Sequence, residues 1–296
     1  MKFIRFEYQK AVFLGLLAED GQSAVKLSDL LEKEISSDMN EFILSHKEED
    51  IEKIKGRMGS ALSKSIPISD LRLLAPIARP LHDILCVGFN YSDHFAEIKK
   101  QMNKPSLQAP EKTVYFTKRA LFIAGDREEV QGRFDLDEKM DYEVELAVIL
   151  GRGGKDVKKE EALEHVFGYC VFNDLSSRSI QLGHKQWFRG KSLDGYTAMG
   201  PYILHSSAMD FPMKRRITAH VNGELRQDSN TEYFVKDVPS VISELSEGLT
   251  LCCGDIIATG TPAGVGMAME PPRFLQAGDE VCCEIEGLGK LTTIIR

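Results

Sequence analysis

The chain has 296 residues, of which 43% are hydrophobic, and its 45 acidic and 37 basic side chains give a formal net charge of -8. The length is sufficient for one large domain and one small domain. The acidic balance and the lack of a basic stripe argue against nucleic-acid binding. No apolar run approaches the ~18 residues that suggest a membrane span, and the N-terminus is too rich in charge for a signal peptide. We therefore expect a globular cytoplasmic protein without nucleic-acid or membrane partners.

Residues 1–75 predict a small α+β domain. Ile4, Phe6 and Tyr8 alternate with other, mostly charged residues, as in a strand, and 12–17 is a second apolar strand candidate. Apolar residues at helical spacing follow over 51–62. Prolines then interrupt the chain at Pro67, Pro76 and Pro80, and we place the domain boundary there, with the second domain covering 76–296.

The six cysteines form no Cys-x-x-Cys pair, and most of them lie among apolar strand residues. Neighbouring cysteines on a strand point to opposite faces, which suits neither one shared zinc nor a mutual disulfide. We expect buried free thiols in a reducing compartment.

The stretch 141–150, DYEVELAVIL, is the most informative part of the chain. Its even positions form one continuous apolar face, and its odd positions begin Asp141, Glu143 and Glu145 before turning apolar. Two carboxylates about 7 Å apart on one strand face repel each other if they are buried. Mg²⁺ or Mn²⁺ would compensate, because carboxylate oxygens are their preferred ligands. The alternative is the solvent side of an edge strand, and 284–286 repeats the Glu-x-Glu pattern beside a turn.

A third carboxylate ends the next apolar strand candidate. The run 166–172 is apolar and is followed by Asn173 and Asp174. An acid at the end of a buried strand is a common position for a ligand or a catalytic group. The alternative is a turn or cap residue for the segment that begins at Ser176.

Two further segments carry groups suited to proton transfer or charge stabilisation. His94 and Glu97 share a face if 90–98 is a helical turn, and a carboxylate can hold an imidazole in the tautomer that deprotonates water. Lys191 follows Trp187, the only tryptophan, and would stabilise an oxyanion from a desolvated pocket. The alternatives are an exposed pair on a surface helix and a surface lysine in a glycine-rich loop.

The chain from residue 201 onward predicts short strands separated by turns. A glycine-rich loop follows at 260–266, but it lacks the Gly-Lys-Ser/Thr ending of a nucleotide-binding P-loop. We expect its backbone at Gly260 and the hydroxyl of Thr261 to approach a small carboxylate.

The order and spacing of these motifs resemble the fumarylacetoacetate hydrolase superfamily over roughly residues 80–296. The resemblance rests on 141–147, 173–178, 186–195, 199–201, 88–94 and 259–266. It implies an α+β, mainly β fold, with a mixed β-sandwich or β-roll catalytic domain, a lid at about 90–110 and a homodimer. One difference concerns Phe89, because some close relatives carry arginine there and contact the substrate carboxylate differently.

The resemblance also implies the roles of individual residues. The ligands of one Mg²⁺ or Mn²⁺ would be Glu143, Glu145 and Asp174. The catalytic residues would be His94 and Glu97 on the lid, together with Lys191. The substrate-binding residues would be Phe89, Asn90, Gln181, Gly260 and Thr261.

We therefore expect an enzyme that cleaves a C–C bond in a small 2-oxo acid and is inhibited by oxalate-like anions. Loss of carbon dioxide would make the reaction oxaloacetate decarboxylation, and attack of activated water on a 4-oxo group would make it acylpyruvate hydrolysis. The alternatives are isomerisation of a hydroxymuconate-like dienoate, dehydration of a 2-oxo-3-deoxy sugar acid, and a non-catalytic regulatory protein on the same fold.

Overall fold

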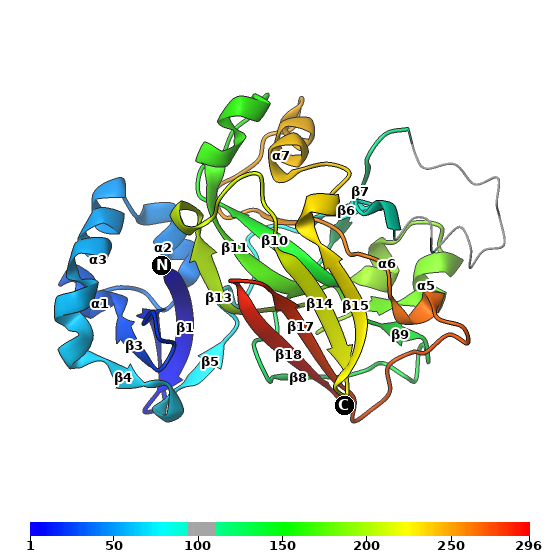
Figure 1. Ribbon diagram of the computed structural model, residues 1–296, viewed down its shortest axis with the longest axis horizontal. Coiled ribbons are helices and arrows are strands. Elements are labelled where there is room, and N and C mark those ends of the chain that lie inside the picture. Colours follow the sequence, from blue (N-terminus) through cyan, green and yellow to red (C-terminus); the bar gives the residue numbers. More distant parts are fainter. Residues whose placement is uncertain (94–96, 98–110) are drawn as a thin grey trace.

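The protein is described by a computed structural model over residues 1–93, 97 and 111–296, and it is built around two β-sheets (Figure 1). The larger sheet has eleven strands, of which ten follow one path and β5 pairs with β1. In spatial order they are β4 (Ile66–Pro67), β3 (Ser23–Lys26), β2 (Ala11–Leu17), β1 (Lys2–Tyr8), β13 (Ala198–His205), β11 (Val166–Asn173), β10 (Val144–Leu150), β16 (Ile256–Ala258), β6 (Ile84–Gly88) and β7 (Val114–Lys118), with β5 at Arg72–Leu74.

The smaller sheet has five strands, and a separate pair of short strands lies beside the larger sheet. The five are β15 (Glu224–Asn230), β14 (Arg216–Val221), β17 (Glu280–Ile285), β18 (Gly289–Ile295) and β8 (Glu129–Val130), and the pair is β12 (Ser176–Ser177) with β9 (Met140–Asp141). Among the described residues, the α-helices with defined bounds are α1 (Leu27–Leu31), α2 (Met39–Ser45), α3 (Glu48–Ala61), α5 (Arg178–Gly183), α6 (Phe188–Lys191) and α7 (Val238–Ser246). The 3₁₀ turns are η1 (Leu62–Lys64), η2 (Ile68–Asp70), η3 (Lys159–His165), η4 (Ser206–Ala208), η5 (Thr231–Tyr233) and η6 (Gly266–Ala268). No helix among the described residues is both long enough and apolar enough to cross a bilayer.

Strand β10 lies in the middle of the larger sheet and is buried on both faces. Its even positions, such as Leu146 and Val148, belong to the core shared with β14 and β17 of the smaller sheet. Its odd positions Ala147 and Ile149 belong to a second core, which includes residues of α1, α2 and α3. The alternation in the sequence therefore predicts the two faces correctly, and the α+β, mainly β class is confirmed.

The strand expected over 141–150 is interrupted at Tyr142 and Glu143. Asp141 belongs to β9, while β10 begins at Val144. Side chains replace the ladder at the break, because the Tyr142 N–H donates to Asp141 Oδ1 at 3.0 Å and the Glu143 N–H donates to Asn173 Oδ1 at 3.2 Å. Sequence periodicity does not predict such a break, because the break leaves the alternation of side chains intact.

The N-terminal segment joins the larger sheet rather than forming a separate one. Strand β1 pairs antiparallel with β13, with Lys2 opposite Leu204 and Phe3 opposite Ile203. The helices of this segment lie at one end of the molecule, on the left of Figure 1. The boundary at residue 75 stays a prediction.

The expectation of buried thiols is wrong for Cys252. All six cysteines are free, and Cys86, Cys170 and Cys283 are buried, but Cys252 is exposed. The physical reason is local, because Cys252 lies in the turn that precedes β16 and not in a strand.

Helices α5 and α6 pack closely through Gly190. A Cβ atom built at Gly190 would lie 2.5 Å from the backbone nitrogen and Cα of Gln181. That is closer than any real contact, and the obstructing atoms are backbone atoms that cannot turn aside. Gly190 therefore sets the distance between the helix that carries Gln181 and the helix that ends at Lys191.

We expect Gly190→Ala to destabilise the protein by about 1–3 kcal/mol, the usual cost of overpacking. The matched control is Gly183→Ala at the end of α5, where a Cβ would meet nothing within 4 Å, and the change should stay within about 0.5 kcal/mol. Thermal unfolding of both variants checks the pair. Equal melting temperatures would show that α5 and α6 do not need this close approach.

Candidate active site and metal centre

Neighbouring strands of the larger sheet bring the candidate site residues together. Asp174 follows the end of β11, and Glu143 and Glu145 lie at the start of its antiparallel partner β10. Strand β16 also runs antiparallel to β10, so its end carries Gly260 and Thr261 toward the same edge. Helices α5 and α6 lie beside this edge, at the right of Figure 1.

The three carboxylates predicted as metal ligands converge. One oxygen of each of Glu143, Glu145 and Asp174 lies within 4.8 Å of the others, and all three side chains are buried. Burial, followed by the charges of Asp174 and Glu143, raises the pKa of the Glu145 carboxyl well above its usual value. The group is therefore suited to a hard divalent cation, which accepts an all-oxygen ligand set.

Lys191 lies between two of these carboxylates. Its Nζ donates to Glu143 Oε2 and to Asp174 Oδ2, both at 2.6 Å, and the residue is 1% exposed. Burial alone would lower the pKa of Lys191, but the charges of Asp174 and Glu143 outweigh it and raise the pKa. The surface-lysine alternative is therefore wrong.

Glu145 is the carboxylate without a cationic partner. Its Oε2 accepts a hydrogen bond from the Gly260 N–H at 2.8 Å, yet no ion pair reaches it from any described residue. A carboxylate that is only 2% exposed is costly without a compensating charge. This arrangement leaves a place for a cation from solution.

The structure reveals three site residues that the sequence did not predict as such: Lys118, Arg178 and Asp141. Lys118, at the end of β7, is fully buried, and its Nζ donates to Asp174 Oδ1 at 2.5 Å and to the Leu175 carbonyl at 2.9 Å. Burial lowers the pKa of Lys118. Arg178 donates from Nε to Asp141 Oδ2 at 2.8 Å and from Nη1 to Glu143 Oε1 at 2.6 Å.

Two of these residues carry signals that the sequence contains. Lys118 is a charged residue at the end of strand β7, and a charged residue at a strand end is also the signal that identified Asp174. Arg178 lies three residues before Gln181 on α5, so the two side chains share a helix face, and Arg178 Nη1 donates to Gln181 Oε1 at 3.1 Å. Asp141 needs the fold, because its side-chain partners Arg178 and Gly266–Met267 come from two distant segments.

Asp141 connects the carboxylate cluster to the glycine-rich loop. Its two oxygens accept hydrogen bonds from the N–H groups of Gly266 at 2.7 Å and Met267 at 2.9 Å, besides the guanidinium of Arg178. The loop that the sequence identified at 260–266 is thus fixed to the cluster at both ends, through Gly260 and Gly266.

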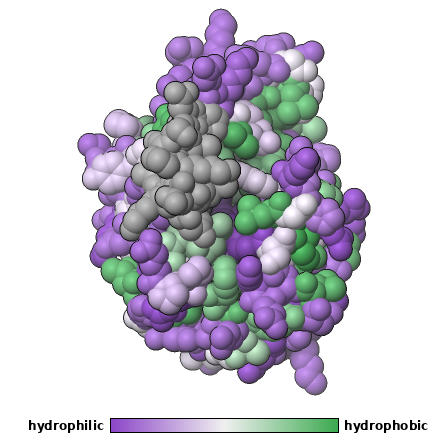
Figure 2. Space-filling model, turned by 90° about the vertical axis from the view of Figure 1, so that its right-hand side faces the viewer, coloured by the Kyte–Doolittle hydropathy of each residue, from purple (hydrophilic) through white to green (hydrophobic). Residues whose placement is uncertain are grey.

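A cavity of about 400 Å³ opens beside the cluster. Its polar lining consists of Glu143, Glu145, Arg178, Gln181, Lys191 and Thr261, and its apolar lining consists of Val87, Gly88, Phe89, Phe116, Leu182, Trp187 and Met267. Phe89 and Phe116 each contact the Trp187 ring edge-on, at centroid distances of 5.2 and 5.1 Å. The cavity therefore combines charged and polar groups with aromatic and aliphatic side chains. At the end of the molecule that carries α5 and α6, hydrophobic and hydrophilic residues are interspersed on the surface (Figure 2).

The residues predicted to bind substrate divide into two groups. Phe89, Gln181 and Thr261 line the cavity. The amide of Asn90 instead binds backbone, donating to Thr259 O at 2.8 Å and accepting from the Lys236 N–H at 2.8 Å. The N–H of Gly260 binds Glu145. Substrate contact by any of the five stays a prediction.

His94 and most of the predicted lid, residues 94–96 and 98–110, lie outside the described residues. Glu97 is described, and its carboxylate accepts the Gly264 N–H at 2.9 and 3.1 Å. Glu97 is thereby placed against the glycine-rich loop.

Comparison with known proteins agrees with this geometry. The family model for the fumarylacetoacetate (FAA) hydrolase C-terminal region matches residues 83–296. The chain is 36% identical over 308 aligned residues to oxaloacetate tautomerase YisK of Bacillus subtilis, and the alignment covers 100% of both chains. It is also similar to the solved fumarylacetoacetate hydrolase of Exiguobacterium antarcticum, with a TM-score of 0.84, 38% identity and coverage of 100% and 99% of the two chains.

A third relative was solved with ligands. The maleylpyruvate hydrolase of Sphingobium sp. SYK-6, in complex with manganese(II) and pyruvate, matches with a TM-score of 0.75 and 25% identity over 100% of this chain and 98% of that one. The family model covers more than two thirds of the chain, and the full-length relative exceeds 30% identity. The chain therefore belongs to the fumarylacetoacetate hydrolase family.

Proposed function

We propose that this protein is a divalent-metal-dependent enzyme that forms an enolate from a small 2-oxo acid, with oxaloacetate as the first candidate substrate. The observation that carries the proposal is the buried Glu145 carboxylate, which joins Glu143 and Asp174 but has no cationic partner among the described residues. The full-length relative named as an oxaloacetate tautomerase supports the choice of substrate.

The residues fit Mg²⁺ or Mn²⁺. Four buried carboxylates, counting Asp141, face three buried cations, Lys118, Lys191 and Arg178, which leaves one net negative charge. Glu143, Glu145 and Asp174 would hold the ion, and it would act as a Lewis acid toward a 2-oxo carboxylate. The cluster would then be net positive, as recognition of an anionic acid requires.

Protein groups bind and orient the substrate in this proposal. Arg178 lines the cavity, and its buried Nη2 has no hydrogen-bond partner in the described part of the chain. A guanidinium nitrogen in this state can donate to a substrate carboxylate, with Gln181 beside it. Phe89, Phe116 and Trp187 supply apolar surface beside these groups, and a less polar environment strengthens such interactions. A cavity of about 400 Å³ lies at the small end of the usual range for ligand sites.

Lys191 stabilises the charge that develops in the reaction. In decarboxylation the C3–C4 bond of oxaloacetate breaks, carbon dioxide leaves, the electron pair becomes the C2–C3 enolate, and C3 then takes a proton. In tautomerisation a proton leaves C3 and another is added to the C2 oxygen. Both reactions place negative charge on that oxygen, and a preorganised ammonium group stabilises it more than it stabilises the ketone.

Acylpyruvate hydrolysis is the second candidate, and the position of Glu97 favours it. Its contact with Gly264 places it beside the loop that carries Thr261 into the cavity. In this reaction His94 would take a proton from water, Glu97 would orient the imidazole, and the water oxygen would attack the 4-oxo carbon.

The direct test measures turnover of oxaloacetate and acetylpyruvate with Mg²⁺, with Mn²⁺ and with excess chelator. Enol absorbance separates tautomerisation from pyruvate release. We expect activity on at least one acid that chelator abolishes and either metal restores. Full activity in chelator, or no turnover of any 2-oxo acid, would contradict the proposal.

The raised pKa of Glu145 predicts opposite effects of Glu145→Gln on stability and metal binding. An acid whose pKa is raised on folding contributes stability below its unfolded pKa, and that stability is lost as the pH rises through the folded pKa. At pH 7, above the ordinary carboxyl pKa, the metal-free wild type has less of this stability than the glutamine variant, because glutamine mimics the protonated form at every pH. We expect a higher melting temperature for Glu145→Gln in chelator, and loss of the stabilisation that Mn²⁺ gives the wild type.

Thermal melts with and without Mn²⁺ measure the stability of the metal-free protein and its stabilisation by the metal. The conservative Glu284→Gln variant, at a half-buried glutamate near the end of β17, is the control. It removes only a surface ion pair with Lys290, worth ~0–1 kcal/mol, and should leave the stabilisation by Mn²⁺ unchanged. A Glu145→Gln protein that Mn²⁺ stabilises as strongly as the wild type would remove Glu145 from the metal site.

Lys191→Met removes the charge and keeps the volume of the stem. We expect kcat to fall about 10²-fold, with KM changed less, because the lost interaction is stronger in the transition state. Oxalate, a planar dianion similar to the enolate of pyruvate, should inhibit the variant weakly. Lys185→Met, at an exposed lysine before α6, is the control. Wild-type turnover and oxalate inhibition in Lys191→Met would exclude this role.

A further inference from the structure

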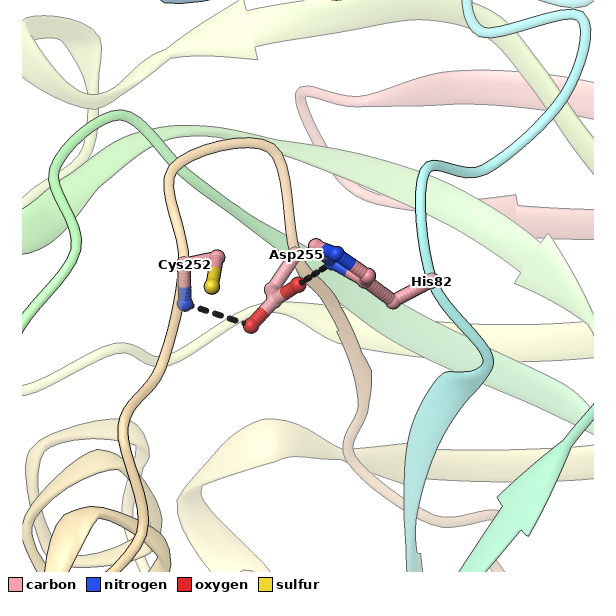
Figure 3. A group of neighbouring side chains, drawn as sticks. All are labelled: His82, Cys252 and Asp255. Atoms are coloured by element: carbon pink, nitrogen blue, oxygen red, sulfur yellow. Dashed lines mark hydrogen bonds and ion pairs between the residues drawn. The ribbon is translucent and has the colours of Figure 1, made fainter.

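A second group of metal-ligating side chains lies where β6 and β16 begin. His82 precedes β6, and Cys252 and Asp255 lie in the turn before β16 (Figure 3). One ligand atom from each of the three lies within 4.8 Å of the others. The carboxylate cluster of the active site lies toward the other ends of these strands, so the two groups do not share residues.

The pairing of the two strands brings these residues together. Strands β6 and β16 are parallel, with Leu85 opposite Ile257, so the segments that lead into them enter side by side. Gly254 makes the turn before β16 possible, because its φ of +86° is one that other residues rarely adopt.

Asp255 is the fixed member of the group. It is 8% exposed, its Oδ2 accepts the Cys252 N–H at 2.7 Å, and its Oδ1 lies 2.7 Å from His82 Nδ1 (Figure 3). His82 and Cys252 are exposed. The Asp255 carboxylate is therefore preorganised. The exposed side chains of His82 and Cys252 lie next to it and are less constrained in orientation.

We propose that His82, Cys252 and Asp255 bind a divalent metal ion of borderline softness, with Zn²⁺ as the best fit. Nitrogen, sulfur and oxygen from three side chains form a ligand set that Zn²⁺ accepts, with water completing a tetrahedron. Mg²⁺ is a poor occupant, because it prefers oxygen ligands only. The two clusters of this protein therefore select different metals.

The bound ion would cross-link the segments that lead into β6 and β16. These strands end at Gly88 and Ala258, and the Asn90 amide ties the far ends together through Thr259 O. Phe89 and Thr261, just beyond the strands, line the active-site cavity. Zn²⁺ would thus stabilise the strand pair that supports the cavity while staying outside it.

The test uses the full chain with excess Mg²⁺, which occupies the carboxylate cluster, and Co²⁺ as a spectroscopic substitute for Zn²⁺. We expect a thiolate-to-cobalt charge-transfer band that stoichiometric Zn²⁺ removes. Cys252→Ser should abolish the band and weaken Zn²⁺ binding by more than ~10²-fold, since loss of a ligand exceeds the 10–100-fold effect of losing an outer-shell partner. His82→Gln should weaken binding comparably.

The matched control is Cys253→Ser. Its thiol points elsewhere, with Sγ 3.1 Å from the Gly151 carbonyl, so the band and the affinity should persist. Equal Zn²⁺ affinity in the wild type and Cys252→Ser, or no thiolate band in the wild type, would show that these residues form only a hydrogen-bonded surface group. Loss of the band in Cys253→Ser alone would also overturn the assignment.

Discussion

The burial of four carboxylates around one point is the constraint on which the rest of the structure depends. Asp141, Glu143, Glu145 and Asp174 are each at most 5% exposed, and such a cluster is unstable without compensation. Two lysines, one arginine and the N–H groups of the glycine-rich loop compensate most of this negative charge. The remaining negative charge supports the proposal that a bound cation completes the cluster.

The sheet makes this concentration of charge possible. Strands β11, β10 and β16 are neighbours, and their alternating directions bring two strand ends and one strand start to the same edge. The apolar residues on both faces of β10 anchor that edge in two hydrophobic cores. Rigid strands hold the carboxylates, while the lysine that touches two of them comes from the short helix α6. The scaffold thus holds the ligands in fixed positions, which favours preorganised catalysis.

Local pattern was sufficient to predict the two faces of 141–150 and the carboxylates at the strand ends, because strand alternation and charged strand ends are features of contiguous residues. The mainly β class and the grouping of Glu143, Glu145 and Asp174 at one site were predicted from the resemblance to the family. The break after Asp141, the pairing of β1 with β13 and the contact between Lys118 and Asp174 depend on partners that are distant in sequence. Asp141 was missed for the same reason, whereas Arg178 could have been found from its spacing to Gln181 on one helix face. Catalysis by His94 and substrate contact by Asn90 stay predictions.

The most direct test of the account is anomalous diffraction at the manganese absorption edge from crystals of the wild-type protein grown with Mn²⁺. We expect one strong peak bounded by oxygens of Glu143, Glu145 and Asp174. We also expect that Nζ of Lys191 no longer bridges Glu143 and Asp174, as it does here at 2.6 Å. A protein without a peak at this position, with the Lys191 bridge unchanged, would contradict the central claim that a cation from solution completes the buried cluster.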